Sequence, residues 1–144
     1  MTLHMVLEPR AQLPLWKRIT PVLAVAVTRV LIVTTTPGRL EAVLRFVSRG
    51  ARSASYDETN RARSDVVSVS IRCAGQYCLE RSISAVLLLR MRGRWADWIS
   101  GVNLQPFAAH AWLEVDGTPV GESLNLDGFQ KNIVVQTSSR RARQ

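Results

Sequence analysis

The chain has 144 residues, 47% of them hydrophobic, which is enough for one compact domain with a core and too few for two. It carries 19 Lys and Arg against 11 Asp and Glu, a net charge of +8, which favours an acidic partner (nucleic acid, membrane surface or acidic peptide) without choosing among them. The most apolar stretch, residues 19–33, is interrupted by Pro21 and Arg29, which argues against both a membrane span and a signal peptide. We therefore expect a cytoplasmic protein without membrane association.

The cysteine and histidine content argues against a disulfide and against a metal. Cys73 and Cys78 lie close together in the chain, and a protein of this size does not need a disulfide for stability. The two cysteines and two histidines match none of the common zinc-binding spacings. We expect reduced thiols, no metal and no cofactor.

Residues from about 13 to 73 are expected to form helices. A first helix is predicted over 16–33, and the run Thr-Thr-Thr-Pro-Gly at 34–38 ends it. In residues 39–49 the aliphatic side chains recur at positions i, i+3, i+4 and i+7, which predicts a second helix. A third helix is expected to begin at Asp57, a residue type that often caps helices.

The second half of the chain predicts one helix followed by strands. Residues 79–91 are aliphatic on nearly all sides, which is typical of a central, buried helix. The Asp116-Gly117 pair is a strong signal for a tight hairpin turn. Strands are expected at 95–102, 107–115, 118–120 and 133–135.

This order of elements predicts an α+β fold with N-terminal helices, a central helix that begins at Cys78, a candidate nucleophile, and a small antiparallel sheet. We expect a single domain over residues 1–144. Its helical part covers about 13–73, its catalytic core about 74–136, and a disordered basic tail 137–144.

Cys78 and His110 are the candidate catalytic pair. Cys78 precedes the central helix, where the positive end of the helix dipole stabilises a thiolate. His110 lies among alanines on a predicted strand, where an imidazole has no obvious packing role, and an imidazole can activate a thiol. The alternative is that Cys78 is an ordinary core residue, which is the most frequent fate of a free cysteine and the one we expect for Cys73.

Glu122 is our choice for a third, acidic group beside the imidazole. The hairpin at 116–117 brings the end of the following strand back towards His110, which places Glu122 near the ring. Asp116 is the competitor, but a position in the hairpin turn is sufficient reason for an aspartate there.

Three segments together resemble the transglutaminase-like B proteins of lasso-peptide biosynthesis. They are Cys-Leu-Glu-Arg-Ser at 78–82, Pro-Phe-Ala-Ala-His-Ala-Trp at 106–112 and Pro-Val-Gly-Glu at 119–122. The resemblance covers nearly the whole chain, and the best match is the stand-alone peptidase form, in which the leader-binding domain is a separate polypeptide.

The resemblance implies a papain- or transglutaminase-like core and a cysteine peptidase that removes the leader from a ribosomally made precursor peptide, before a separate cyclase forms the macrolactam. The family's nucleophile falls on Cys78, its histidine on His110 and its acid on Glu122, where the wider family often has Asp. The implied partners are the precursor, a separate leader-binding protein (a RiPP recognition element) and the lasso cyclase, with no nucleic acid.

The expected mechanism is attack of the Cys78 thiolate on the scissile carbonyl, with His110 acting first as base and then as acid. Glu122 would orient the ring and stabilise its cation. Backbone N–H groups at the helix start, including that of Cys78, are expected to bind the oxyanion.

Two other functions remain open at this stage. Acyl transfer to an amine, as in transglutaminases, uses the same acyl-enzyme and differs in whether water or an amine resolves the thioester. A non-catalytic nucleic-acid-binding module would need exposed aromatic residues beside clustered basic ones. Trp95, Trp98 and Trp112 instead fall in predicted strands, where core packing explains them.

Overall fold

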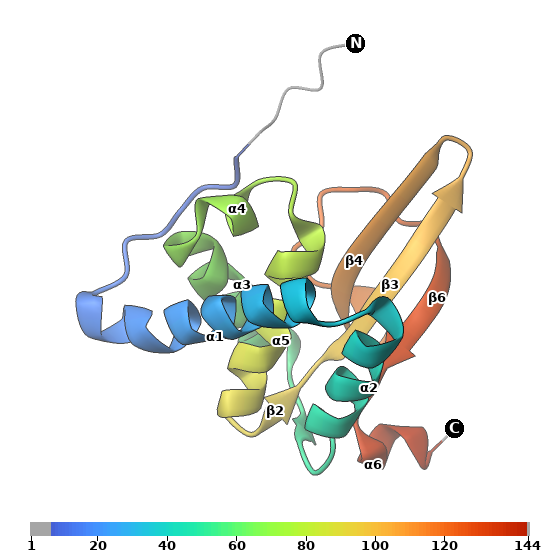
Figure 1. Ribbon diagram of the computed structural model, residues 1–144, viewed down its shortest axis with the longest axis horizontal. Helices are drawn as coiled ribbons and strands as arrows, with labels where there is room; N and C mark the ends of the chain where they lie inside the picture. The colour runs from blue at the N-terminus through green and yellow to red at the C-terminus, as the bar shows by residue number, and fades with distance from the viewer. Residues whose placement is uncertain (1–6, 144) are drawn as a thin grey trace.

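The computed structural model describes residues 7–143, in which most of the helical residues lie to one side of a small sheet (Figure 1). The helices are α1 (Leu15–Thr34), α2 (Pro37–Val47), α3 (Tyr56–Val69), α4 (Ile71–Ala74), α5 (Cys78–Met91) and α6 (Ser138–Arg141). The strands are β1 (Arg52–Ser53), β2 (Arg94–Trp95), β3 (Asp97–Leu104), β4 (Phe107–Val115), β5 (Thr118–Pro119) and β6 (Gln130–Val135). The α+β fold class is confirmed.

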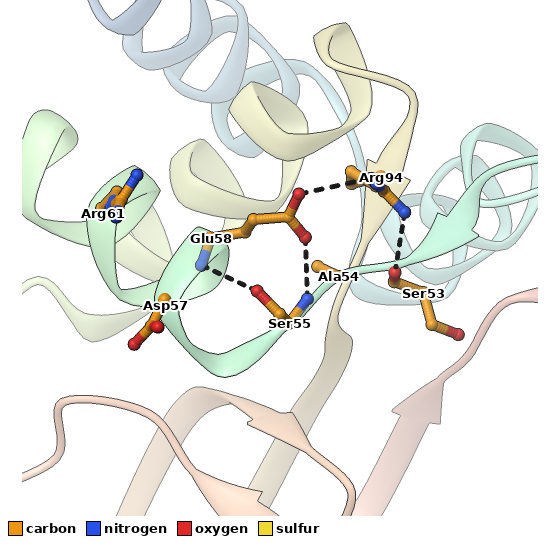
Figure 2. Close-up of a pocket in the computed structure, with 7 residues that line it drawn as sticks. All are labelled: Ser53, Ala54, Ser55, Asp57, Glu58, Arg61 and Arg94. Carbon is orange, nitrogen blue, oxygen red and sulfur yellow. Dashed lines mark hydrogen bonds and ion pairs between the residues drawn. The ribbon is translucent and has the colours of Figure 1, made fainter.

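Helix α3 begins with a capping box, which the sequence signals as Ser-x-x-Glu. Ser55 Oγ accepts a hydrogen bond from the Glu58 N–H at 3.2 Å, and the Glu58 carboxylate accepts one from the Ser55 N–H at 2.8 Å. Figure 2 shows this box at the edge of a surface hollow, with Arg94 3.4 Å from the Glu58 carboxylate. The expectation that Asp57 opens this helix is wrong, because Ser55 is the N-cap.

Helix α5 is the centre of the molecule and packs against α1, α3 and strand β4. Ten consecutive residues of this helix, Glu80–Leu89, are buried, as its aliphatic sequence predicted. Because elements pack on several sides of α5, its N-terminal residue is held rigidly relative to β4.

The four-stranded sheet has the order β5-β4-β3-β6, with every neighbouring pair antiparallel. The hairpin between β4 and β5 turns at Asp116 and Gly117, both with positive φ, as the Asp-Gly pair predicted. A second, parallel pairing joins β1 to β2. That pairing was not predicted, because two-residue strands leave no periodic pattern in the sequence.

Helix α1 has one buried and one exposed apolar face. Ala24, Val25 and Thr28 are buried, whereas Val27 and Val30 on the opposite face are half exposed or more. Within residues 7–143, none of the helices combines the length and apolar character needed to cross a bilayer. Trp95, Trp98 and Trp112 are all at most 3% exposed, so these side chains do belong to packed regions.

The basic tail, for which we expect disorder over residues 137–144, contains a short helix in its described part. Residues Ser138–Arg141 form α6, and Arg140 lies 3.4 Å from the buried Asp97 carboxylate and also pairs with Asp116. These ion pairs, which connect residues far apart in the sequence, give the tail a fixed position that its local composition does not reveal.

Candidate active site

The thiol of Cys78 stands at the first residue of α5, where the loop from α4 enters the helix. Cys78 is partly buried, whereas Cys73 is fully buried in the core. The loop is held from within the helix, because Arg81 Nη1 donates to the carbonyls of Cys73 at 3.3 Å and Gly75 at 3.0 Å. Arg81 is therefore buried, and its guanidinium holds the loop that precedes Cys78.

The imidazole of His110 lies between aromatic rings on strand β4. It stacks on Trp112, two residues along the same strand face, with ring centroids 5.9 Å apart and planes 17° from parallel. Phe129 meets the ring edge-on, with centroids 6.1 Å apart. These contacts restrict the rotation of the ring. The imidazole therefore does pack against other side chains, although its alanine neighbours in the sequence gave no sign of it.

The carboxylate of Glu122 reaches the imidazole from the far side of the β4–β5 hairpin. Its Oε2 lies 2.8 Å from His110 Nε2, and the two side chains are 6% and 13% exposed. Pairing of Glu114 with Pro119 and of Val115 with Thr118 sets a register that, continued, places residue 122 opposite residue 111. Side chains of residues 111 and 110 point to opposite faces, so this register alone would not bring Glu122 to the ring. Strand β5 ends at Pro119, and Gly121 with its φ of +64° breaks the register, after which the Glu122 carboxylate contacts His110, the contact that the sequence predicted.

Asp116, the competing acid, lies in the turn and not beside the ring. Its side chain is 84% exposed and pairs with Arg140. It is six residues from His110 along an extended strand, a separation of about 20 Å. The structure thus brings together Cys78, His110 and Glu122 and leaves Asp116 apart.

The thiol and the imidazole are coupled through their pKa values. Burial alone would raise the pKa of Cys78, but hydrogen bonds to the His110 ring and from the Ala111 N–H outweigh it and lower the pKa. Burial likewise opposes the charged form of His110, yet its hydrogen bonds to Cys78 and Glu122 raise the pKa of the ring to about 9. Both shifts favour a thiolate–imidazolium pair over the neutral pair.

The pKa of Glu122 changes in the direction that suits this pair. Burial opposes its charge, but the hydrogen bond to His110, followed by the charges of His110, Arg63 and Arg81, lowers the pKa of the carboxyl group. Because Glu122 occupies Nε2 of His110, Nδ1 is left for the thiol. The carboxylate thus stabilises the charged form of the ring from its Nε2 side.

The backbone N–H of Cys78, which we expected to bind the oxyanion, has another hydrogen-bond partner. It donates to the Gln76 carbonyl at 2.9 Å, so it is already engaged. The other N–H groups of the first turn of α5 are better placed to stabilise an oxyanion, since the first N–H groups of a helix lack partners within the helix.

The sequence did not indicate two further residues around the site, Arg63 and Glu8. Arg63 is 7% exposed on the inward face of α3, and it binds the Glu8 carboxylate through both terminal nitrogens at 2.6 Å. A signal was present, because Arg63 falls beside Ala62 and one turn before Val66 and Val67 on a helix face that is otherwise apolar. A charged residue on such a face requires a buried partner.

One of three comparisons with known proteins identifies a family. The family model of the transglutaminase-like superfamily matches residues 22–134, which is well over half of the chain and contains Cys78, His110 and Glu122. No curated protein and no solved structure matches the chain.

Proposed function

Because the chain belongs to the transglutaminase-like superfamily, we propose that it is a cysteine peptidase that removes the leader from a lasso-peptide precursor. The observation that carries the proposal is the contact of Glu122 with His110 Nε2 at 2.8 Å, with Cys78 at the start of α5 and the pKa of its thiol lowered while the pKa of His110 is raised. The leader-peptidase specificity rests on the resemblance of segments 78–82, 106–112 and 119–122 to the stand-alone B proteins.

In the proposed reaction the Cys78 thiolate attacks the scissile carbonyl carbon, and a tetrahedral oxyanion forms. The His110 imidazolium then gives its proton to the leaving amine, which departs as the new N-terminus of the core peptide. The acyl group stays on sulfur as a thioester. His110, now neutral, takes a proton from water, which attacks the thioester and releases the leader as a carboxylic acid.

Glu122 contributes by holding the ring and stabilising its positive charge. The carboxylate is nearly buried, so its interaction with the imidazolium is little screened by solvent. It does not accept the proton, because the pKa values of the two groups are displaced in opposite directions.

We further propose that a separate leader-binding protein presents the precursor to this chain, as the resemblance implies. The exposed apolar face of α1 around Val27 and Val30 is the surface that we assign to this partner. Binding to a common partner would raise the effective concentration of the scissile bond near Cys78.

The test uses the precursor peptide and the leader-binding protein that we expect the neighbouring genes to encode, with cleavage measured by mass spectrometry at low precursor concentration. We expect slow cleavage by the chain alone and strong acceleration by the leader-binding protein. Val30→Asp should reduce the acceleration without changing the rate of the chain alone. Equal rates with and without the partner would contradict the partner proposal, and an uncleaved precursor in both would contradict the peptidase.

A further inference from the structure

A buried arginine lies directly behind the carboxylate of the site. Arg63 Nε is 3.8 Å from Glu122 Oε1, and the two side chains are 8% and 6% exposed. Glu122 therefore faces a different cation with each oxygen, the His110 ring with Oε2 and the Arg63 guanidinium with Oε1. A carboxylate that is held on both oxygens cannot rotate away from the ring without losing one of these contacts.

The guanidinium is not saturated by its other partner. Its two terminal nitrogens bind Glu8, but among residues 7–143 its Nε is a buried donor without a hydrogen-bond acceptor. Nearly every buried donor in a folded protein has a partner, and leaving one unsatisfied costs free energy. A movement of Glu122 towards Arg63 by about 0.9 Å would form that hydrogen bond. The geometry thus biases the carboxylate towards one orientation.

The backbone next to Glu122 is fitted to the same guanidinium. Gly121 has a φ of +64°, and a Cβ at this position would lie 3.1 Å from Arg63 Cδ and 3.2 Å from its Nε and Cζ. A side chain at residue 121 would therefore displace either Arg63 or the segment that carries Glu122. The close approach couples the position of Arg63 to that of the acid.

The segment before α1 holds Arg63 from the other side. The Glu8 N–H donates to the Ala74 carbonyl at 3.0 Å, which attaches this segment to the loop before the nucleophile. The Glu8 carboxylate accepts two hydrogen bonds from Arg63 and also lies 3.5 Å from Arg81, which binds the carbonyls of that loop. Arg63, Arg81 and Glu122 are buried, and together with the partly exposed Glu8 they form a charged cluster behind His110.

We infer that Arg63 is a positioning residue that aims the Glu122 carboxylate at His110, and that Glu8 holds Arg63 in place. The inference rests on the proposed roles of Cys78, His110 and Glu122. By this inference the N-terminal segment contributes to the site through Glu8, although it lies more than 50 residues along the chain from the rest of the cluster.

The inference requires that Arg63 act through Glu122, and a double-mutant cycle tests this directly. The measured quantity is the rate of Cys78 alkylation by iodoacetamide at pH 7, which reports the reactive thiolate and needs no peptide substrate. All variants carry Cys73→Ala, so that Cys78 is the one remaining thiol. Failure of leader cleavage would contradict the proposed function and leave this measurement unaffected.

Arg63→Gln should lower the alkylation rate about tenfold when Glu122 is present and by less than about twofold in the Glu122→Ala background. Arg63→Lys should lie between, because it keeps the charge and loses the planar fork. Equal losses in both backgrounds, or no loss with Glu122 present, would overturn the inference.

Glu8→Gln and Asp65→Asn complete the design. Glu8→Gln leaves Arg63 intact and should lower the rate about threefold, again only when Glu122 is present. This variant and Arg63→Lys decide the question if Arg63→Gln does not fold. Asp65 lies on the same helix as Arg63, and its carboxylate is 3.0 Å from Arg92 at the end of α5. Asp65→Asn weakens that partly exposed ion pair and should leave the rate unchanged. A comparable loss there would mean that the rate follows the stability of α3, which would refute the inference.

Discussion

Replacing Glu122 by Gln removes the charge beside His110 while keeping the size of the side chain. The contact with Nε2 is 2.8 Å long and nearly buried, so it is a charge-assisted hydrogen bond with little solvent screening. Such bonds contribute about 1.5–3 kcal/mol. At about 1.4 kcal/mol per factor of ten, kcat should fall by about 10- to 150-fold.

The matched control is Asp116→Asn, which makes the same carboxylate-to-amide change in the β4–β5 turn. Asn tolerates the positive φ of 52° at this position, and the Asp116 side chain is 84% exposed. We therefore expect the kcat of this variant to stay within about twofold of the unchanged chain.

Both variants are compared in one steady-state cleavage assay, with circular dichroism to show that they are folded. The loss in Glu122→Gln should remain smaller than that in His110→Ala, because an orienting group contributes less than the base that it orients. A larger loss for folded Asp116→Asn than for Glu122→Gln would refute the assignment of the third group.

Three further outcomes follow from the site and the fold. Cys78→Ala should abolish cleavage. Cys73→Ala should retain most of it, because Cys73 is fully buried and burial raises the pKa of its thiol. Loss of cleavage in folded Cys73→Ala alone would mean that Cys73 is the nucleophile. The pH profile of kcat/KM should fall on its alkaline side near pH 9, because His110 there loses the proton that it gives to the leaving amine. Glu122→Gln should move this alkaline limb to lower pH. A limb near pH 6.5 in the unchanged chain would mean that the ring is not coupled to its neighbours. Ser55→Ala should lower the free energy of unfolding by about 1 kcal/mol in a denaturant titration, because it removes the capping box of α3. An unchanged denaturant concentration at the unfolding midpoint would contradict that role.

The parts of the site that the sequence predicted are those that local geometry determines. A two-residue turn at Asp116 and Gly117 folds the chain back along β4, so the segment that carries Glu122 returns towards His110. The final orientation of the carboxylate depends in addition on the positive φ of Gly121. The position of Cys78 at a helix start follows from the change in pattern at that residue. The catalytic roles of the three residues remain predictions.

The parts that were missed depend on contacts between distant segments. Arg63 and Glu8 are 55 residues apart, and no local pattern indicates that their side chains meet. The pairing of β1 with β2 and the ion pairs that hold Arg140 in the tail have the same origin. The capping box at Ser55 is different, because its Ser-x-x-Glu signal was readable and Asp57 was preferred over it.

The most direct test of a peptidase at Cys78 is cleavage of the precursor in water enriched in oxygen-18, with the leader-binding protein present and the products weighed by mass spectrometry. If water resolves the thioester, the released leader carries one oxygen-18 in its new carboxyl group, the core peptide carries none, and Cys78→Ala gives neither product. A leader joined to an amine without the heavy oxygen would show acyl transfer instead, and an intact precursor would contradict the account altogether.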